Sequence, residues 1–376
     1  MSIERDPIVP FAHLSDWEAN LRRVARDGVA LCEDLPRIAE RFEAWWAHEC
    51  LDRPIFIAHT QNPPGRAVTK RTDMLFEPAR WFAEKKADLL SLRHVGDGLP
   101  NLRVDFGPVL LGGLLGGRVE FVPTTSWTHP LIDDDWSNAP GGIITDNQGL
   151  WDLLRALTEM VCADAAGRYL LCTPDLGGSA DVLLNLRGSE ALCMDVIERP
   201  RIIRQAIDAI YPAWHEAFAM LYDTATAHGV GLVHWLEVWS SRPYMIPACD
   251  FNYMISPSQF SEICLPDIAR QTATVGRGVF HLDGPGATNH IDALLEVPHL
   301  DAIQFVPGSG TPSVLPWLNM FKKIQAKGRS MLIVCSAREL EALCDAVKPE
   351  GLGVLMYDCP SDQLDALFAR FCGRYA

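Results

Sequence analysis

Short apolar runs that end in polar residues beside a glycine or proline recur along the chain, and amphipathic stretches separate them. Runs of this kind are typical of buried parallel strands, whereas apolar residues repeated every three or four positions indicate helices. The predicted strands are 54–59, 102–106, 169–173, 231–237, 278–283, 302–306, 331–335 and 353–358. The predicted helices include 151–166, 200–227, 292–296, 317–326 and 337–347. Eight strands alternating with helices favour an α/β fold, a single (β/α)8 barrel, over an open sheet.

Two segments fall outside this alternation. Residues 1–50 are predicted to form an N-terminal helical extension, because 17–26 and 38–48 are both amphipathic, and the barrel is expected over 51–376. Residues 107–147, after the second strand, lack sustained periodicity and are rich in Gly, Pro and Trp. They are interpreted as one long loop, and a loop of that length within a compact domain is usually functional.

Composition narrows the class of protein. A hydrophobic content of 48% and a charged content of 22% over 376 residues are those of a soluble globular chain. The net charge of −15 argues against nucleic acid or an anionic membrane as a partner, and no run of about 18 apolar residues predicts a membrane span. Eleven Cys without a regular framework, and a polar start without a secretion signal, indicate reduced thiols in a cytoplasmic protein. The sequence also allows a homo-oligomer.

Polar side chains follow many of the predicted strands. In a barrel the C-terminal ends of the strands converge on one face, where barrel enzymes keep their chemistry. The residues in question are Asp175, His234, Glu237, His281, Asp283, Gln304, Cys335 and Cys359. Since a purely stabilising role would favour the opposite face, the sequence predicts a catalytic pocket for a small-molecule substrate, with Asp175 and Gln304 among the groups that contact it.

Within that set, one imidazole and two thiols with a carboxylate nearby suit Zn²⁺, a borderline-soft ion. The candidate metal ligands are therefore His281, Asp283, Cys335 and Cys359. Three protein ligands and an open position would make such a site catalytic. The alternative is that the two thiols are small buried residues, as most free cysteines are.

Two further features suggest substrate contacts. Aromatic residues flank the fourth and fifth strands, namely Trp235, Trp239, Tyr244 and Tyr253. Together with Glu237 and Asp250 they could form a box that holds a methylated ammonium group, or they could be ordinary core residues. Arg187 could anchor a substrate carboxylate through a bidentate pair, or could form a structural ion pair.

These features together resemble the uroporphyrinogen decarboxylase superfamily. The similarity runs from about residue 52 to the C-terminus, and it includes Asp250-Phe-Asn-Tyr-Met-Ile-Ser-Pro257, Gly177-Gly178 followed by Leu186-Arg187-Gly188, and the order of the strands. It is greatest for the methyltransferase-like branch, whose members carry strands like His281-Leu-Asp-Gly-Pro-Gly286 and Ile303-Gln-Phe-Val-Pro-Gly308. The resemblance implies a single (β/α)8 barrel with its active site at the C-terminal ends of the strands.

The resemblance also implies two activities. The decarboxylases bind their tetrapyrrole through paired Arg residues on the first strand, but residues 54–60 contain no Arg, which disfavours that reaction. The corrinoid-linked methyltransferases hold zinc with His-x-Cys on strand five and a second Cys near strand eight. Here His281 matches the His, Asp283 stands in the first Cys position and Cys359 in the second, while Cys335 could restore a thiolate.

The leading hypothesis is thus a zinc-dependent methyltransferase that moves a methyl group between a small methylated substrate and a corrinoid protein or another methyl carrier. Asp283, Glu237 or His234 would handle the proton that the leaving heteroatom requires. Because the chain lacks Asp-x-His-x-x-Gly, the corrinoid would be carried by a separate protein. The alternatives are a metal-independent decarboxylase or lyase that uses His281 and Asp283 as an acid–base pair, and a non-catalytic barrel that binds a small ligand.

Overall fold

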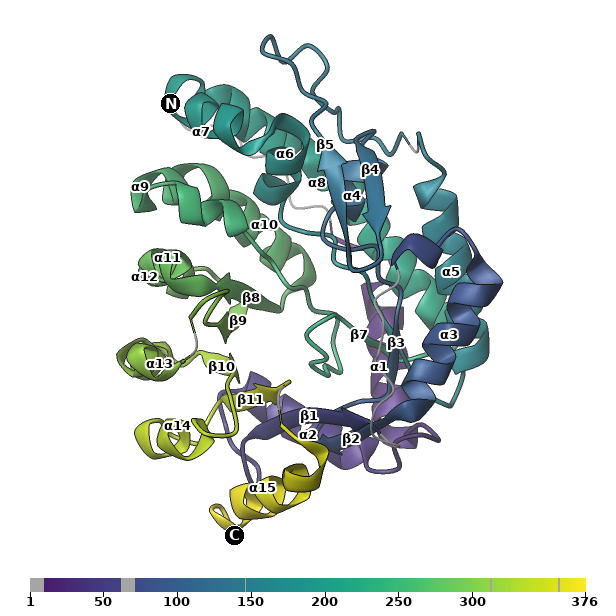
Figure 1. Ribbon diagram of the computed structural model, residues 1–376, viewed down its shortest axis with the longest axis vertical. Coiled ribbons are helices and arrows are strands. Elements are labelled where there is room, and N and C mark those ends of the chain that lie inside the picture. The colour runs from purple at the N-terminus through teal and green to yellow at the C-terminus, as the bar shows by residue number, and fades with distance from the viewer. Residues whose placement is uncertain (1–9, 62–71, 146, 312, 358) are drawn as a thin grey trace.

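The computed structural model describes residues 10–61, 72–145, 147–311, 313–357 and 359–376. In these residues the main strands form two parallel groups that curve around a common centre, with helices on the outside (Figure 1). The first group has the order β1-β11-β10-β9-β8 and the second has the order β3-β6-β7. Their bounds are β1 Ile55–Gln61, β3 Asn101–Arg103, β6 Leu170–Cys172, β7 Leu232–Val233, β8 Gly278–Asp283, β9 Leu300–Val306, β10 Ser330–Val334 and β11 Leu352–Met356.

The α/β class with parallel strands is confirmed, and each of the eight predicted strands overlaps an observed one. The structure differs from the prediction in two ways, both at the edges of the two strand groups. β2 (Leu92–Gly96) was not predicted and pairs antiparallel with β1, and no ladder joins β3 to β1 or β2 in the described part of the chain. Between β7 and β8, residues 245–248 pair with β8 through two isolated bridges, Met245 with Gly278 and Ala248 with His281.

The helices cover the outer side of both groups. The predicted helices are found as α5 (Leu150–Ala165), α8 (Pro200–Ala227), α12 (Ile291–Leu295), α13 (Leu318–Ala326) and α14 (Leu340–Ala346). Apart from two helices at the N-terminus, the other described helices of four or more residues are α3 Pro78–Ser91, α4 Leu110–Leu114, α6 Ser179–Arg187, α7 Ser189–Glu198, η2 Asp250–Met254, η3 Phe260–Cys264, α10 Leu265–Val275, α11 Gly284–Ala287 and α15 Ser361–Gly373. The single-turn helices are η1 Thr72–Met74, α9 Pro257–Gln259, η4 Thr288–His290 and η5 Leu315–Trp317.

The N-terminal extension consists of α1 (Leu14–Asp27) and α2 (Leu35–Trp46), where two amphipathic helices were predicted. The indole of Trp17 donates to Asp223 of α8 at 2.7 Å, and that of Trp45 donates to the carbonyl oxygen of Met331 at 3.0 Å. Because Met331 lies near the start of β10, α2 packs at the end of the strands that is opposite to the predicted site.

The prediction of one long loop over 107–147 is wrong for much of that segment. It contains α4 and an antiparallel hairpin of β4 (Arg118–Val122) and β5 (Thr125–His129). Each strand is only five residues long and buries few side chains, such as Val119 and Ser126. Glycines surround this short alternation, so the hairpin has almost no hydrophobic signal in the sequence.

Candidate functional site

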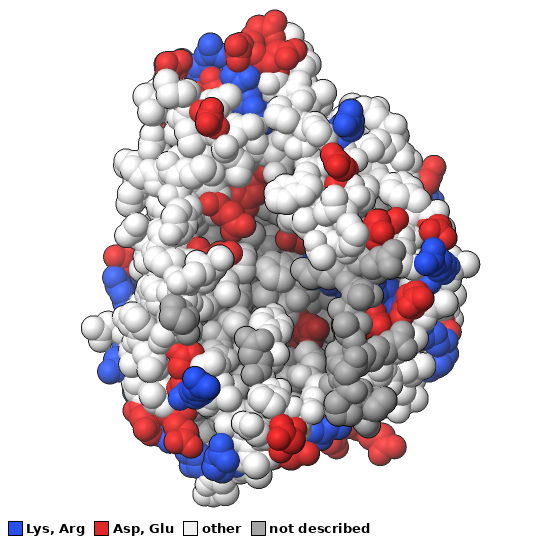
Figure 2. Space-filling model, in the orientation of Figure 1, with Lys and Arg blue, Asp and Glu red and all other residues white. Residues whose placement is uncertain are grey.

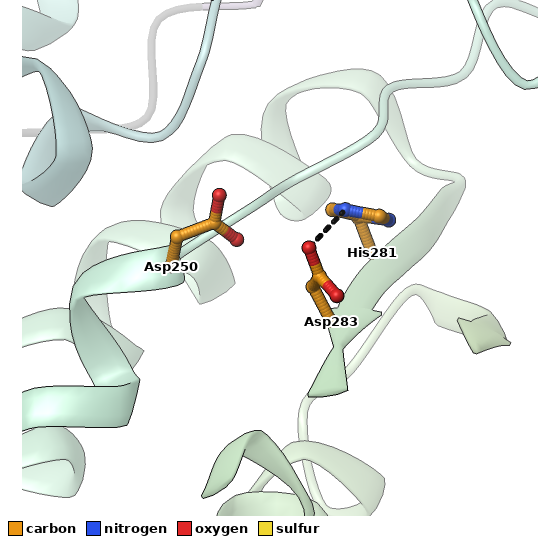
Figure 3. Close-up of side chains that lie close together, drawn as sticks. All are labelled: Asp250, His281 and Asp283. Atoms are coloured by element: carbon orange, nitrogen blue, oxygen red, sulfur yellow. Dashed lines mark ion pairs between the residues drawn. The ribbon is translucent and has the colours of Figure 1, made fainter. Parts of the chain in front are cut away.

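The C-terminal end of β8 and the start of η2 bring three potential metal ligands together. His281 and Asp283 are two apart on β8 and therefore share a face. Asp250, the first residue of η2, approaches them from the other side (Figure 3). One donor atom from each of the three lies within 4.8 Å of the others, and His281 Nε2 is 4.0 Å from Asp283 Oδ2.

The neighbouring strand fixes the orientation of His281. Gln304 lies opposite His281 in the β8–β9 register, is almost fully buried, and its side-chain oxygen accepts a hydrogen bond from Nδ1 of the imidazole. Because an amide oxygen only accepts, Nδ1 is the donor in this bond, which leaves Nε2 directed toward the two carboxylates. Trp235 packs edge-on against the same ring, with 4.9 Å between ring centroids.

Two glycines allow the loops after β8 and β9 to meet behind Asp283. Gly284 and Gly308 have φ values of +75° and +79°, which favour glycine. A Cβ atom at Gly308 would lie 2.8 Å from the Cα atom of Gly284 and 3.5 Å from Asp283 Oδ1. Close backbone contact beside the site therefore requires glycine at position 308, whereas Gly284 is favoured by its positive φ.

Negative charge accumulates around these ligands. Burial raises the pKa of Asp250, and the Asp283 and Asp175 carboxylates add to that effect against the opposing influence of His281. Burial also raises the pKa of Asp175, whose carboxylate accepts the backbone N–H of Gly177 at 2.8 Å. Figure 2 shows a hollow at the centre of this face with carboxylates on its walls, whereas most basic side chains lie on the outer surface. The arrangement favours a bound cation.

A second polar cluster joins His59 of β1, its ladder partner His94 of β2, and Glu237 in the segment after β7. His59 Nε2 is 2.5 Å from Glu237 Oε2, and His94 contacts His59 edge to face, with ring centroids 4.8 Å apart. Burial alone would lower the pKa of His59, but the charge and hydrogen bond of Glu237 raise it above its ordinary value. Burial lowers the pKa of His94 to about 4, so that ring is neutral. Glu237 has a φ of +58°, a strained conformation of the kind that clusters at functional sites.

The structure places other predicted site residues in the core. The nitrogens of His234 contact Thr173 Oγ1 at 2.7 Å and the Tyr222 hydroxyl at 3.0 Å, and burial lowers its pKa to about 3. With both nitrogens engaged, His234 has no free position for proton transfer to a substrate. Trp239 is fully buried and accepts the Trp46 indole N–H on its carbonyl oxygen, so it belongs to the core, not to an aromatic box.

Arg187 and Tyr253 have different surroundings. The Arg187 guanidinium donates to Asp195 at 2.7 Å, to Asp134 at 2.8 Å and to the carbonyl oxygen of Ile132 at 3.1 Å, and only 8% of its side chain is exposed. These bonds correspond to the structural ion pair, not to an anchor for a substrate carboxylate. Tyr253 is exposed, and its ring lies against Gly286 in the loop that follows Asp283.

The two candidate thiolate ligands lie outside the cluster of Asp250, His281 and Asp283. Burial raises the pKa of the Cys335 thiol, and Cys344 in α14 and Glu339 at its start raise that pKa further. The thiol of Cys359 contacts the carbonyl oxygen of Pro360 at 3.7 Å, at the start of α15. Of the four predicted metal ligands, the structure thus brings together His281 and Asp283, adds the carboxylate of Asp250, and leaves both thiols outside the cluster.

Sequence reasoning missed part of this site. It considered Asp250 only for an aromatic box and noted His59 only as the end of a strand. It assigned no role to His94, because β2 was not predicted, or to Asp181, whose carboxylate binds the backbone near Asp250. The contact of His94 with His59 and the contact of Asp181 with the backbone of Asp250 each join residues far apart in sequence, so spacing along the chain does not predict them.

A nitrogen and two carboxylate oxygens with open positions suit a divalent metal such as Zn²⁺ or Mn²⁺. The residues present therefore fit a catalytic metal, although not through the thiolates that the family resemblance implied. The His59–Glu237 pair can hold a proton. Arg103 connects the two clusters, because it influences the pKa of Asp175, near His281, and the pKa of Tyr357, near Glu237.

Comparisons with known proteins identify the fold. No protein-family model matches the chain, and no curated protein does so either. Among solved structures, the chain is similar to a methyltransferase from Methanosarcina mazei, with a TM-score of 0.57, 13% sequence identity, and 90% of this chain and 99% of that chain covered. At this identity the likeness establishes a shared fold. None of the described helices has the length and apolar character needed to cross a membrane.

Proposed function

We propose that this chain is a metal-dependent methyltransferase that moves a methyl group between a small methylated substrate and a methyl carrier. The observation that carries the proposal is the cluster of Asp250, His281 and Asp283, in which Gln304 engages Nδ1 of His281 and leaves Nε2 as the nitrogen that faces the carboxylates. The fold shared with a methyltransferase supports the reaction class. In this proposal the two groups of parallel strands are parts of one incomplete (β/α)8 barrel with the cluster inside it.

The three clustered residues would hold the metal, for which Zn²⁺ is our first expectation. A bound divalent ion would polarise the heteroatom that gives or takes the methyl group and lower its pKa. Asp250 and Asp283 would balance the charge of the ion, while His281 would supply the nitrogen ligand. Trp235, which packs against His281, and Tyr253, which packs beside the loop after Asp283, would limit the space available to the substrate.

Proton transfer would fall to the His59–Glu237 pair. Glu237 raises the pKa of His59 and so favours its imidazolium form, which would give a proton to a departing amine, alkoxide or thiolate and recover it later. This role replaces the one expected of His234, whose nitrogens are both occupied.

The methyl carrier in this proposal is a corrinoid on a separate protein. The location is cytoplasmic, which agrees with the eleven free cysteines. A homo-oligomer remains compatible with the proposal.

The decisive experiment is metal analysis of the full chain, joined to an activity screen. We expect close to one Zn²⁺ or Mn²⁺ per chain, lost in Asp250→Ala and His281→Ala, and methylation of cob(I)alamin by one class among methylated amines, thiols and methoxyaromatics. Absence of metal together with CO₂ release from a carboxylated compound would favour the lyase. Ligand-induced thermal stabilisation without turnover would favour a binding protein.

A further inference from the structure

The backbone that carries Asp250 is held by a residue from another helix. Asp250 and Phe251 are the first two residues of η2, and the residue before them, Cys249, provides no side-chain cap. The first N–H groups of any helix lack partners within that helix. Here both are bound by Asp181 in the first turn of α6, with Oδ2 accepting from Asp250 N at 3.0 Å and Oδ1 accepting from Phe251 N at 2.8 Å.

The turn that carries Asp181 is seated closely on the same segment. A Cβ atom at Gly178 would lie 1.8 Å from the carbonyl oxygen of Ala248, so only glycine permits this contact. This requirement accounts for a glycine in the Gly177-Gly178 pair. The α6 turn is itself tied to α10 by a hydrogen bond from Gln271 to Ser179 at 3.2 Å.

The opposite side of the segment is bonded to β8. The N–H group of His281 donates to the carbonyl oxygen of Pro247 at 3.0 Å, and Ala248 pairs with His281 as an isolated bridge. Residues 245–251 therefore lie between the strand that carries His281 and the helix that carries Asp181. The position of Asp250 relative to His281 is set by both contacts.

We propose that Asp181 is a positioning residue for the metal centre, which caps η2 from outside so that the Asp250 carboxylate meets His281 and Asp283. This inference rests on the proposed function, because it concerns the metal ligands. Asp181 acts through the backbone of Asp250 and does not itself belong to the ligand cluster. Such outer contacts on metal ligands typically change affinity 10- to 100-fold.

The test measures Zn²⁺ affinity of the metal-free full chain by competition with a chromogenic chelator, and checks the fold by circular dichroism. Asp181→Asn keeps one accepting oxygen but turns an NH₂ group toward the second N–H, so we expect binding about 10- to 100-fold weaker. Asp181→Glu, which displaces the carboxylate by one methylene, serves if the first variant folds poorly. Asp164→Asn is the matched control, since Asp164 binds Lys86 and Tyr169 instead, and should leave affinity unchanged.

Two further measurements separate the outcomes. Combining Asp181→Asn with Asp250→Asn should weaken binding no more than Asp250→Asn alone, because both act on one ligand. In the wild-type metal-free chain, the amides of Asp250 and Phe251 should be protected from hydrogen exchange. A wild-type chain that binds no metal would overturn the proposed function. If the wild-type chain binds metal, three results would overturn only the role of Asp181. These are an unchanged affinity in the Asp181 variants, additive effects of Asp181→Asn and Asp250→Asn, and amides of Asp250 and Phe251 that are not protected from exchange.

Discussion

Gln304 and His281 are register partners on β9 and β8, and the buried amide oxygen of the first receives the Nδ1 proton of the second. This contact chooses the tautomer of the imidazole as well as its orientation. The ring therefore presents Nε2 to Asp250 and Asp283, and in the neutral ring this nitrogen is the one available to a metal. The chemical role of a His-x-Asp sequence at the end of an apolar strand therefore depends on the residue that pairs with the His on the next strand.

Replacing Gln304 should weaken metal binding without removing a ligand. In Gln304→Leu the Nδ1 proton of His281 has no acceptor, so the ring can rotate or change tautomer, and we expect Zn²⁺ affinity to fall about 10- to 100-fold. Chelator competition measures the affinity, and ¹⁵N NMR of the imidazole reports the tautomer. Gln325→Leu is the control, because Gln325 binds the carbonyl oxygens of Lys348 and Glu350. Equal affinities for the two variants would contradict this account.

Gly308 and Gly310 offer a matched pair of substitutions. Both have a positive φ, +79° and +78°, so the backbone conformation alone should make alanine cost about 1–2 kcal/mol in the free energy of unfolding at either position, and the contact with Gly284 should add to the cost at Gly308. Only at Gly308 would the new Cβ meet Gly284 and approach Asp283, since no described residue lies within 4 Å of a Cβ at Gly310. We expect Gly308→Ala alone to weaken Zn²⁺ binding as well. The prediction fails if the two variants bind the metal equally.

The charge of His59 should depend on Glu237. In the wild-type chain NMR titration should give His59 a pKa above 6.5, because Glu237 outweighs the effect of burial. In Glu237→Gln only burial remains, and the pKa should fall below 6.5. An unchanged pKa would show that the pair does not share a proton.

The same pair predicts how stability changes with pH. A raised His59 pKa stabilises the fold fully below about 6.5, and this contribution is lost as pH rises through the folded-state pKa. The lowered Glu237 pKa stabilises the fold above about 4.5, and this contribution is lost as pH falls. Urea unfolding of wild type and Glu237→Gln should therefore differ most between about pH 4.5 and 6.5, and less at pH 9. A difference that grows toward pH 9 would have the wrong sign.

The strands could be predicted from the sequence because burial on both faces gives continuous apolar runs. The end of β8 was predicted for the same reason, and the alternation of side chains placed His281 and Asp283 on one face. The short antiparallel strands were harder to predict. The β4–β5 hairpin buries too few side chains to create a pattern, and β2 has only one fully buried residue, Val95.

The ligand set was only partly predictable, because strand position does not reveal side-chain direction at an irregular strand end. Cys335 directly follows β10, yet its thiol lies near Cys344 of α14. Asp250 belongs to no strand, and it reaches the site only because residues 245–248 pair with β8 and Asp181 caps η2. These contacts are tertiary, so no local pattern encodes them.

Substitutions of the cysteines and of Asp283 distinguish thiolate from carboxylate ligands of the metal. If Asp250, His281 and Asp283 hold the metal, Cys335→Ala and Cys359→Ala should retain full metal content. Cys335→Ala should also lose about 1 kcal/mol of stability, since it removes one buried atom.

Asp283→Ala should lose most of the metal, whereas Asp283→Cys should recover binding and shift preference from Mn²⁺ toward Zn²⁺, because a thiolate is softer than a carboxylate. Metal analysis after dialysis against Zn²⁺ and Mn²⁺ measures each effect. Loss of metal in Cys359→Ala with retention in Asp283→Ala would restore the thiolate site and exclude the carboxylate one.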